Sequence, residues 1–339
     1  MSDNSMKTEQ RNHLMDLVKG IAALCIVLVH FPFPGIFGAS LACIGVCGVV
    51  FFFLISGYYA FDQDDEAACR KLVKRFKKNL IITLIAVLVY AAYTVIEQAV
   101  LGTMDLWLEN FTNPWLIPRM IVLGDFSFIH GDPLWFMPAL LYSYLILYFL
   151  HKRKIGKYAY ILLPLLLLLR IGTETYTNSY GADWHLSGNF LVGALPIMLL
   201  GHYIAGKKDN FSKLPLYLTA SYTVFAAVLM LISANVPVFG LDISQVFKIW
   251  CAVEVFLLTL RLSGKKPVPF MGRVGDKYSL TIYISHNLIG TFISLILIRP
   301  DAPSWLRSWV LPIIVICASL LTAAVWDHIK KMRAGKKKV

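Results

Sequence analysis

The sequence is organised as long apolar runs separated by short polar loops. A helix needs roughly twenty consecutive apolar residues to cross the hydrocarbon core of a bilayer. By this measure the chain predicts an all-α, polytopic membrane bundle of about ten transmembrane helices. They are expected over residues 14–33, 41–61, 80–101, 134–150, 156–172, 188–206, 214–235, 242–263, 278–298 and 305–326.

Basic residues lie almost entirely in alternate loops. Of the 32 Lys and Arg residues, 26 fall at residues 7 and 11 or in the segments 70–78, 152–157, 207–213, 261–277 and 330–338. Loops that remain in the cytoplasm carry this excess of positive charge. The pattern therefore predicts an even number of helices, both termini in the cytoplasm, and a multi-pass protein of the cell membrane.

The same pattern gives the domain organisation. We expect a cytoplasmic tail over residues 1–13, one membrane-embedded domain over 14–326 and a basic cytoplasmic tail over 327–339. The first apolar run has charges inside it and no small-residue cleavage site, as in an uncleaved signal anchor. The longest loop, about 102–133, contains LWLENFTNPWLIPRM. Its Trp and Pro content suits either an anchor in the outer interface or a lid over an external cavity.

Composition supports a membrane protein. The chain is 58% hydrophobic and 15% charged, whereas about a quarter of the residues in a soluble domain are charged. A net charge of +12 would suggest nucleic acid for a soluble chain, but here topology accounts for it and the expected partner is the lipid bilayer. The six cysteines show no CxxC spacing, so we predict neither a disulfide framework nor a metal site.

The first span carries three ionisable side chains on one face. Asp16, Lys19 and His30 form a polar stripe about 16 Å long at the helical rise and twist. Ionisable groups in a membrane span are costly and are candidates for function. Alternatively, Asp16 and Lys19 neutralise each other near the surface, and His30 lies among the outer headgroups.

A second candidate site follows the second span, near Ser56. Six cations occupy the nine positions 70–78, including Arg70, Lys74, Arg75 and Lys78. Orientation alone needs fewer charges, so the cluster could bind a phosphorylated cytoplasmic ligand. Contact with anionic lipid heads is an equally open interpretation.

Three later spans, the third, eighth and ninth, hold isolated polar groups, and the third contains Glu97 near its outer end. Lys248 and Glu254 point about 120° apart on one helix, so each is expected to find its partner on another helix. Tyr283 and His286 share a face near the middle of the ninth span, where a histidine serves either as a hydrogen-bonded bundle residue or in chemistry. Gly45, Gly48 and Gly57 would let helices approach closely.

Five fragments, in this order, resemble membrane acyltransferase family 3. They are LMDLVKGIAALCIVLVH, GVCGVVFFFLISGYY, KRFKKNLI, LWFMPALLYSYLIL and YSLTIYISHNLI. The resemblance implies an integral membrane acyltransferase that moves an acyl group, commonly acetyl from cytoplasmic acetyl-coenzyme A, to a sugar hydroxyl of an extracytoplasmic or lipid-linked carbohydrate. No permanently bound cofactor is implied.

The resemblance also implies roles for residues. His30 matches the family's first-helix histidine, Asp16 and Lys19 match its upstream aspartate and arginine, and Arg75 and Lys78 match its paired arginines. Lysine replaces arginine at 19 and 78, and lysine lacks the planar bidentate grip on phosphate. Many relatives carry an added hydrolase-like domain, whereas this chain ends twelve residues after Asp327, so we expect it to be the membrane unit alone.

Three functional classes remain at this point. The first is an O-acyltransferase with His30 as general base and with Asp16 and Lys19 as further catalytic residues on the same helix. In this hypothesis Arg75, Lys78, Lys74, Arg70 and Ser56 hold the acyl-coenzyme A donor, and His286, Tyr283, Glu254 and Lys248 hold the substrate. The second is a transporter of a small polar solute such as an amino acid, and the third is a membrane subunit without chemistry. A donor-binding cluster at 70–78 favours the enzyme.

Overall fold

The computed structural model describes residues 12–236, 240–263, 269–297 and 303–336. All ten predicted apolar segments contain helix, and none of the described residues forms a β-strand. The ten principal helices are α1 His13–His30, α2 Gly35–Tyr58, α3 Asp65–Leu101, α6 Phe136–Lys152, α7 Gly156–Tyr180, α8 Leu195–Gly206, α10 Leu216–Ser233, α11 Ser244–Arg261, α13 Ser279–Leu297 and α14 Leu311–Lys336. Short helices join them: α4 Met104–Leu108, α5 Leu116–Val122, α9 Lys208–Ser212 and α12 Pro269–Arg273.

The number of candidate spans is smaller than expected. Within the described ranges, eight helical segments are long and apolar enough to cross a membrane. Two of the ten predicted segments fall short. The segment Phe190–Gly206 is a shorter apolar helix, and α11 carries Lys248, Glu254 and Arg261 within its 18 residues. The fold is a multi-pass helical bundle, and the count of about ten is not confirmed.

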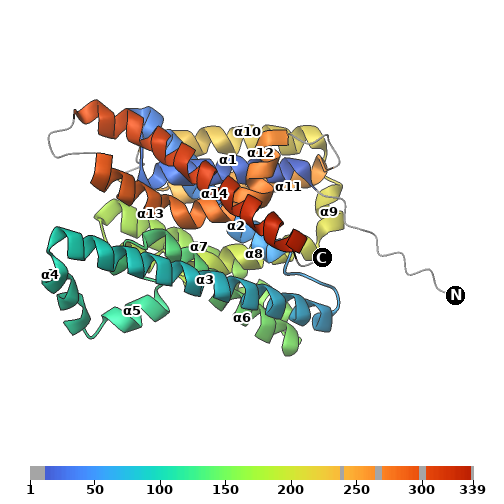
Figure 1. Cartoon of the computed structure of the whole chain (residues 1–339). Coiled ribbons are helices and arrows are strands. Elements are labelled where there is room, and N and C mark those ends of the chain that lie inside the picture. Colours follow the sequence, from blue (N-terminus) through green and yellow to red (C-terminus); the bar gives the residue numbers. More distant parts are fainter. Residues whose placement is uncertain (1–11, 237–239, 264–268, 298–302, 337–339) are drawn as a thin grey trace.

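The basic segment after the second span belongs to α3 rather than to a loop. α3 has 37 residues, about 55 Å of helix, and begins where the Asp64 carboxylate accepts the Ala67 amide at 3.1 Å. Because the hydrocarbon core is only about 30 Å thick, the start of α3 extends beyond it. The described chain ends on the same side of the bundle, whereas α4 and α5 lie at the opposite end (Figure 1).

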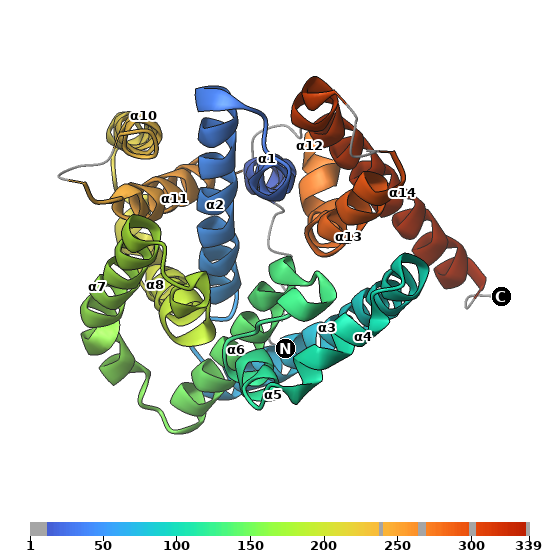
Figure 2. The same cartoon turned by 90° about the vertical axis from the view of Figure 1, so that its left-hand side faces the viewer.

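α1 lies inside the bundle. Figure 2 shows it end-on, between α2 on one side and α12, α13 and α14 on the other. Glycines permit the close approach of α2: a Cβ at Gly48 would stand 2.7 Å from that of Ala22 on α1, and Gly57 abuts the backbone of α8 at Met198. The close contacts predicted for these glycines are confirmed.

Polar contacts anchor both ends of α3. At its start, the Asp65 carboxylate contacts His151 Nδ1 at 2.7 Å, and His151 Nε2 lies 2.8 Å from His202 Nε2. At its far end, Glu97 lies 2.5 Å from His130 Nε2 and accepts a 3.1 Å bond from the Tyr93 hydroxyl. The segment 102–133 is thereby folded against the bundle.

Candidate active site

Two cavities with charged and polar residues in their lining lie toward the two ends of the bundle. The cavity at the basic end, called here the inner cavity, has a volume of about 240 Å³. The cavity at the other end, the outer cavity, has a volume of about 540 Å³. Tyr283 of α13 lines both, so its side chain is part of the wall between them.

The inner cavity collects polar residues from α1, α2, α3 and α6. Its polar lining includes Lys19, Ser56, Arg75, Lys78 and Tyr144. Lys19 Nζ pairs with the Asp16 carboxylate at 2.7 Å, and the Ser56 hydroxyl donates to the Phe52 carbonyl at 2.8 Å. Tyr144 interacts with Arg75 and Ser56. The cavity therefore presents three cations to a ligand that enters from the basic end.

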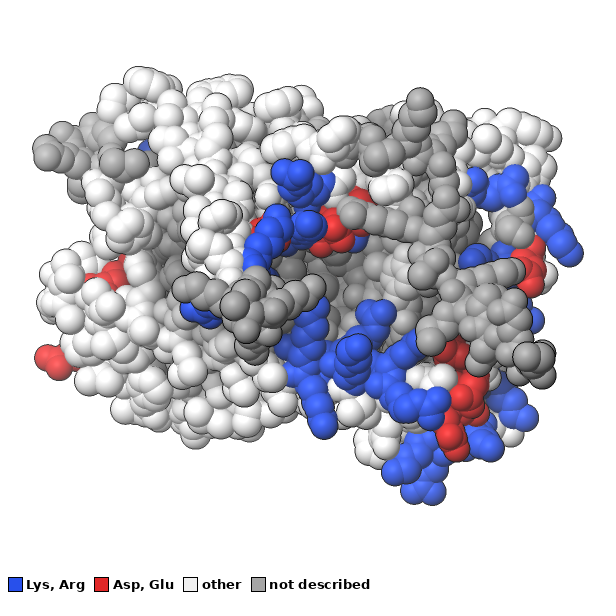
Figure 3. Space-filling model, turned by 45° about the vertical axis from the view of Figure 1, so that its right-hand side comes forward, with Lys and Arg blue, Asp and Glu red and all other residues white. Residues whose placement is uncertain are grey.

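The predicted basic cluster is divided between two faces of α3. Arg75 and Lys78 point into the inner cavity, but Arg70 and Lys74 line a separate surface groove with Lys77. Arg70 also lies 3.7 Å from the Asp64 carboxylate and 3.6 Å from that of Glu66. Figure 3 shows Lys and Arg side chains gathered on the side of the molecule that carries the start of α3.

The outer cavity contains His30, the last residue of α1. Its other charged lining residues are Asp132, just before α6, and Arg170 and Glu174 on α7. Trp135 and Trp184 supply aromatic walls, with ring centroids 6.0 Å apart. His30 is an exposed side chain at this cavity, and the Asp132 carboxylate is close enough to interact electrostatically with its ring. The histidine can therefore reach a ligand from the outer end.

On the side of His30 that faces away from the outer cavity, its neighbour is His286. Their ring centroids are 5.1 Å apart, and His286 is fully buried. Its Nδ1 donates to the Ile282 carbonyl at 3.0 Å, which leaves Nε2 as an acceptor. Across the described ranges, Nε2 has no hydrogen-bond partner. Nearby, the Tyr283 hydroxyl donates to the Pro133 carbonyl at 3.0 Å.

The structure brings most, but not all, of the predicted site residues together. Lys248 and Glu254 on α11 line neither cavity. Glu254 accepts a 3.2 Å bond from Trp250 Nε1 on its own helix, so the expectation of a partner on another helix was wrong for this residue. Asp16 is buried, and its carboxylate pairs with Lys19, which lines the inner cavity.

Several cavity residues were missed from the sequence. Asp132 lies two residues before the LWFMPALLYSYLIL fragment, and Arg170 is one of the six basic residues outside the basic segments. Glu174 follows Arg170 at a spacing of four, which places the two on one helical face. This i, i+4 spacing of two opposite charges in an apolar segment was the signal in the sequence that could have identified both as candidate site residues. Nothing in the sequence indicated that Trp135 and Trp184 would meet.

A charged network lies behind the wall of the outer cavity at Trp184. Arg119 of α5 pairs with Asp125 at 2.8 Å and with Asp183 at 2.7 Å. Asp183 precedes Trp184, which lines the cavity. Burial acts to raise the pKa of Asp183, but hydrogen bonds from the His185 amide and from Arg119 outweigh it and hold that pKa at about 2. The segment 102–133 thus supports the cavity wall, although α4 and α5 do not line the cavity.

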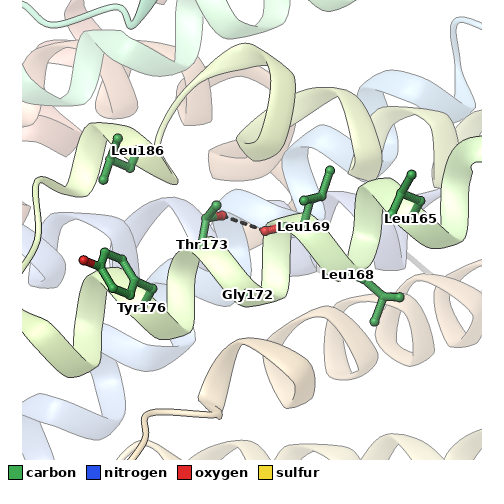
Figure 4. A pocket seen from close by; sticks show the side chains of 7 residues that line it. All are labelled: Leu165, Leu168, Leu169, Gly172, Thr173, Tyr176 and Leu186. Atoms are coloured by element: carbon green, nitrogen blue, oxygen red, sulfur yellow. Dashed lines mark hydrogen bonds between the residues drawn. The ribbon is translucent and has the colours of Figure 1, made fainter.

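The opposite face of α7 carries a different kind of depression. Leu165, Leu168, Leu169, Tyr176 and other residues form an apolar groove, which Leu186 borders (Figure 4). The Thr173 hydroxyl there donates to the Leu169 carbonyl at 2.8 Å. The groove offers apolar surface to lipid chains and no cluster of reactive groups, so it is not the candidate active site.

Comparison with known proteins supports an enzymatic site. Residues 12–326 match the family described as acyltransferase domain, the membrane acyltransferase family 3. The match covers both cavities and every described helix except the end of α14. No curated protein and no solved structure matches the chain.

Proposed function

This chain belongs to the acyltransferase domain family, and on that premise we propose that it transfers an acyl group from coenzyme A to a hydroxyl of an extracytoplasmic carbohydrate. The chain is an acyltransferase of the membrane type. The donor, the acetyl group and the carbohydrate acceptor are our proposal, following the family resemblance of the sequence.

The inner cavity suits the donor. Coenzyme A carries several phosphate charges, and Arg75, Lys78 and Lys19 are the cations of this cavity. Charge-assisted hydrogen bonds to phosphate are shorter and stronger than neutral ones. With its nucleotide held at the basic end, the acyl thioester would extend inward toward Tyr283.

The outer cavity suits the acceptor. A hydroxyl is a weak nucleophile at neutral pH and needs a positioned base, for which histidine is the commonest choice. In the proposed step His30 takes the hydroxyl proton while the oxygen attacks the thioester carbonyl. The new C–O bond forms, the C–S bond breaks, and the departing thiolate of coenzyme A takes up a proton. Asp132 would stabilise the imidazolium electrostatically.

One observation carries this proposal: Tyr283 lines both the basic inner cavity and the outer cavity that contains His30. Reactants held in the two cavities would lie on either side of Tyr283 and would meet after a movement of its side chain. A membrane subunit without chemistry would have no need for this arrangement.

The decisive experiment uses purified protein in liposomes with acetyl-coenzyme A and membrane extract as the source of acceptor. We expect His30→Ala to lower acyl transfer by about 10²–10⁴-fold, the usual contribution of a general base. Expression and thermal unfolding should stay unchanged, because His30 is exposed at the cavity. A normally folded, fully active variant would reject the assignment.

Donor dependence separates the enzyme from a transporter. A carrier of a small polar solute would move labelled amino acid into sealed vesicles with no donor present. The proposed enzyme should show no such uptake and should release coenzyme A only when acyl-coenzyme A and acceptor are both supplied.

A further inference from the structure

The charges of the outer cavity are unbalanced, and they differ in sign from those of the inner cavity. We infer that the acceptor is neutral or carries an amine, and that Glu174 is a specificity-determining residue that disfavours anionic acceptors. This inference rests on the proposed function and adds the charge class of the acceptor.

Arg170 is the one guanidinium in the lining of the outer cavity, but it is not available to bind an anion. Its side chain is buried, with 4% exposed. Nη1 donates to the carbonyls of Val192 and Gly193 in the π-helix η5, Phe190–Ala194. With the Gln245 amide oxygen facing the guanidinium, Nε and Nη2 both donate to it at 2.9 Å.

These hydrogen bonds give Arg170 a structural role. They tie α7 to η5 and to α11, and they occupy most of the donors that a bidentate grip on carboxylate or phosphate would require. An anionic acceptor would therefore have to break existing hydrogen bonds of a buried cation in order to pair with it. The cost of leaving those carbonyls unpaired makes this unfavourable.

The carboxylates, in contrast, remain at the cavity. Asp132 and Glu174 both line it, so with His30 neutral the cavity holds two negative charges and one positive charge. Beside the cavity, Asp125 and Asp183 both pair with Arg119, and His185 lies 3.3 Å from the first carboxylate and 2.8 Å from the second. Two like charges about 8 Å apart at an effective dielectric constant near 20 repel each other by about 2 kcal/mol. Repulsion of this size lowers the affinity for an anionic acceptor by more than about tenfold.

The uncharged part of the wall is compatible with a sugar. Trp135 and Trp184 present aromatic surface, and binding sites of this kind combine apolar walls with a few polar groups that fix orientation. Together these features favour a polyhydroxyl ring without carboxylate or phosphate near the reacting hydroxyl.

The test uses three probes with one ring: methyl glucoside, methyl glucosaminide and methyl glucuronide. Each is added at the outer side of proteoliposomes, and its inhibition of acyl transfer to the membrane-extract acceptor is measured. We expect the glucosaminide to inhibit at a concentration at least about tenfold lower than the glucuronide, with the glucoside between them.

Glu174→Gln should reduce that ratio to about threefold or less, because the variant removes one of the two cavity carboxylates. Glu109→Gln is the matched control: it removes the same charge from an exposed residue outside the cavity, and the ratio should stay at its original value. Thermal unfolding of both variants checks that the fold is intact.

Three results would overturn the inference: a glucuronide that inhibits as well as the glucosaminide, three probes with equal or no effect, or a ratio unchanged in Glu174→Gln. Each would leave the proposed function standing as long as acyl transfer to the extract acceptor depends on His30. Loss of that dependence would instead refute the proposed function.

Discussion

His30 and His286 lie side by side but have different surroundings. His30 opens to the outer cavity, whereas His286 is fully buried and its Nδ1 proton is held by the Ile282 carbonyl. A group that exchanges protons with an acceptor must reach it, so His30 is the better base. His286 is better suited to orienting His30 or the thioester.

We therefore predict that His286→Ala lowers acyl transfer less than His30→Ala does. A loss of about tenfold to a hundredfold is expected, against the larger loss of a general base. Initial rates of coenzyme A release by both variants under saturating donor provide the comparison. The reverse order would exchange the two roles.

Arg75 and Lys74 are adjacent in sequence but face different surroundings. Arg75→Ala should raise the KM for acetyl-coenzyme A by about tenfold, the effect of losing one charge-assisted contact to phosphate. Lys74→Ala is the matched control and should leave KM unchanged, since Lys74 lines the separate groove. Equal effects of the two substitutions would mean that the donor binds along the whole cluster, and no effect of either would favour lipid binding.

At the scale of the element, the position of His30 depends on how closely α1 packs on α2. Gly48→Val would place a Cβ 2.7 Å from that of Ala22, and overpacking of this kind costs about 1–3 kcal/mol. We expect a lower midpoint of thermal unfolding in detergent and reduced acyl transfer.

Gly172→Ala on α7 is the control for that substitution, because apart from its chain neighbours and the adjacent backbone of α7 nothing lies within 4 Å of its added Cβ. Alanine also suits a helix interior better than glycine by about 0.5–1 kcal/mol. The control should unfold at the same or a slightly higher temperature. A Gly48→Val variant as stable as this control would show that α1 and α2 can separate freely.

At the scale of the whole molecule, the outer network should make the cavity wall sensitive to acid. The pKa of Asp183 is about 2 in the folded protein, and that of an unperturbed aspartate is about 3.9. Because the folded value is depressed, the stabilisation is fully present above pH about 4 and is lost as pH falls toward about 2.

Hydrogen exchange of the backbone around residues 116–125 and 183–188 measures this loss. Exchange, corrected for its intrinsic pH dependence, should rise as pH falls below about 4, whereas that of the α1–α2 core should change less. Arg119→Gln should bring the same increase already at neutral pH. If these segments stay equally protected at pH 3, the network does not hold the wall.

The fold was largely predictable from the sequence, whereas the site was predictable only in part. Apolar runs identified all ten helical segments, and the family resemblance is confirmed by the match over residues 12–326. Three details depart from the prediction: Phe190–Gly206 is a shorter apolar helix, α11 has three charges, and the basic segment continues α3 instead of forming a loop.

Hydrophobic period and charge by themselves determined a multi-pass helical bundle, a basic end and an ionisable stripe on α1, because these properties depend on neighbours along the chain. Only tertiary structure decided which faces meet. It divided Arg75 from Lys74, brought Asp132 and Glu174 to His30 from two other elements, excluded Glu254, and placed Tyr283 between the two cavities. The sequence of a helix fixes the direction in which each side chain points from its own axis. Which other helix that side chain faces is decided by packing between residues far apart in the sequence.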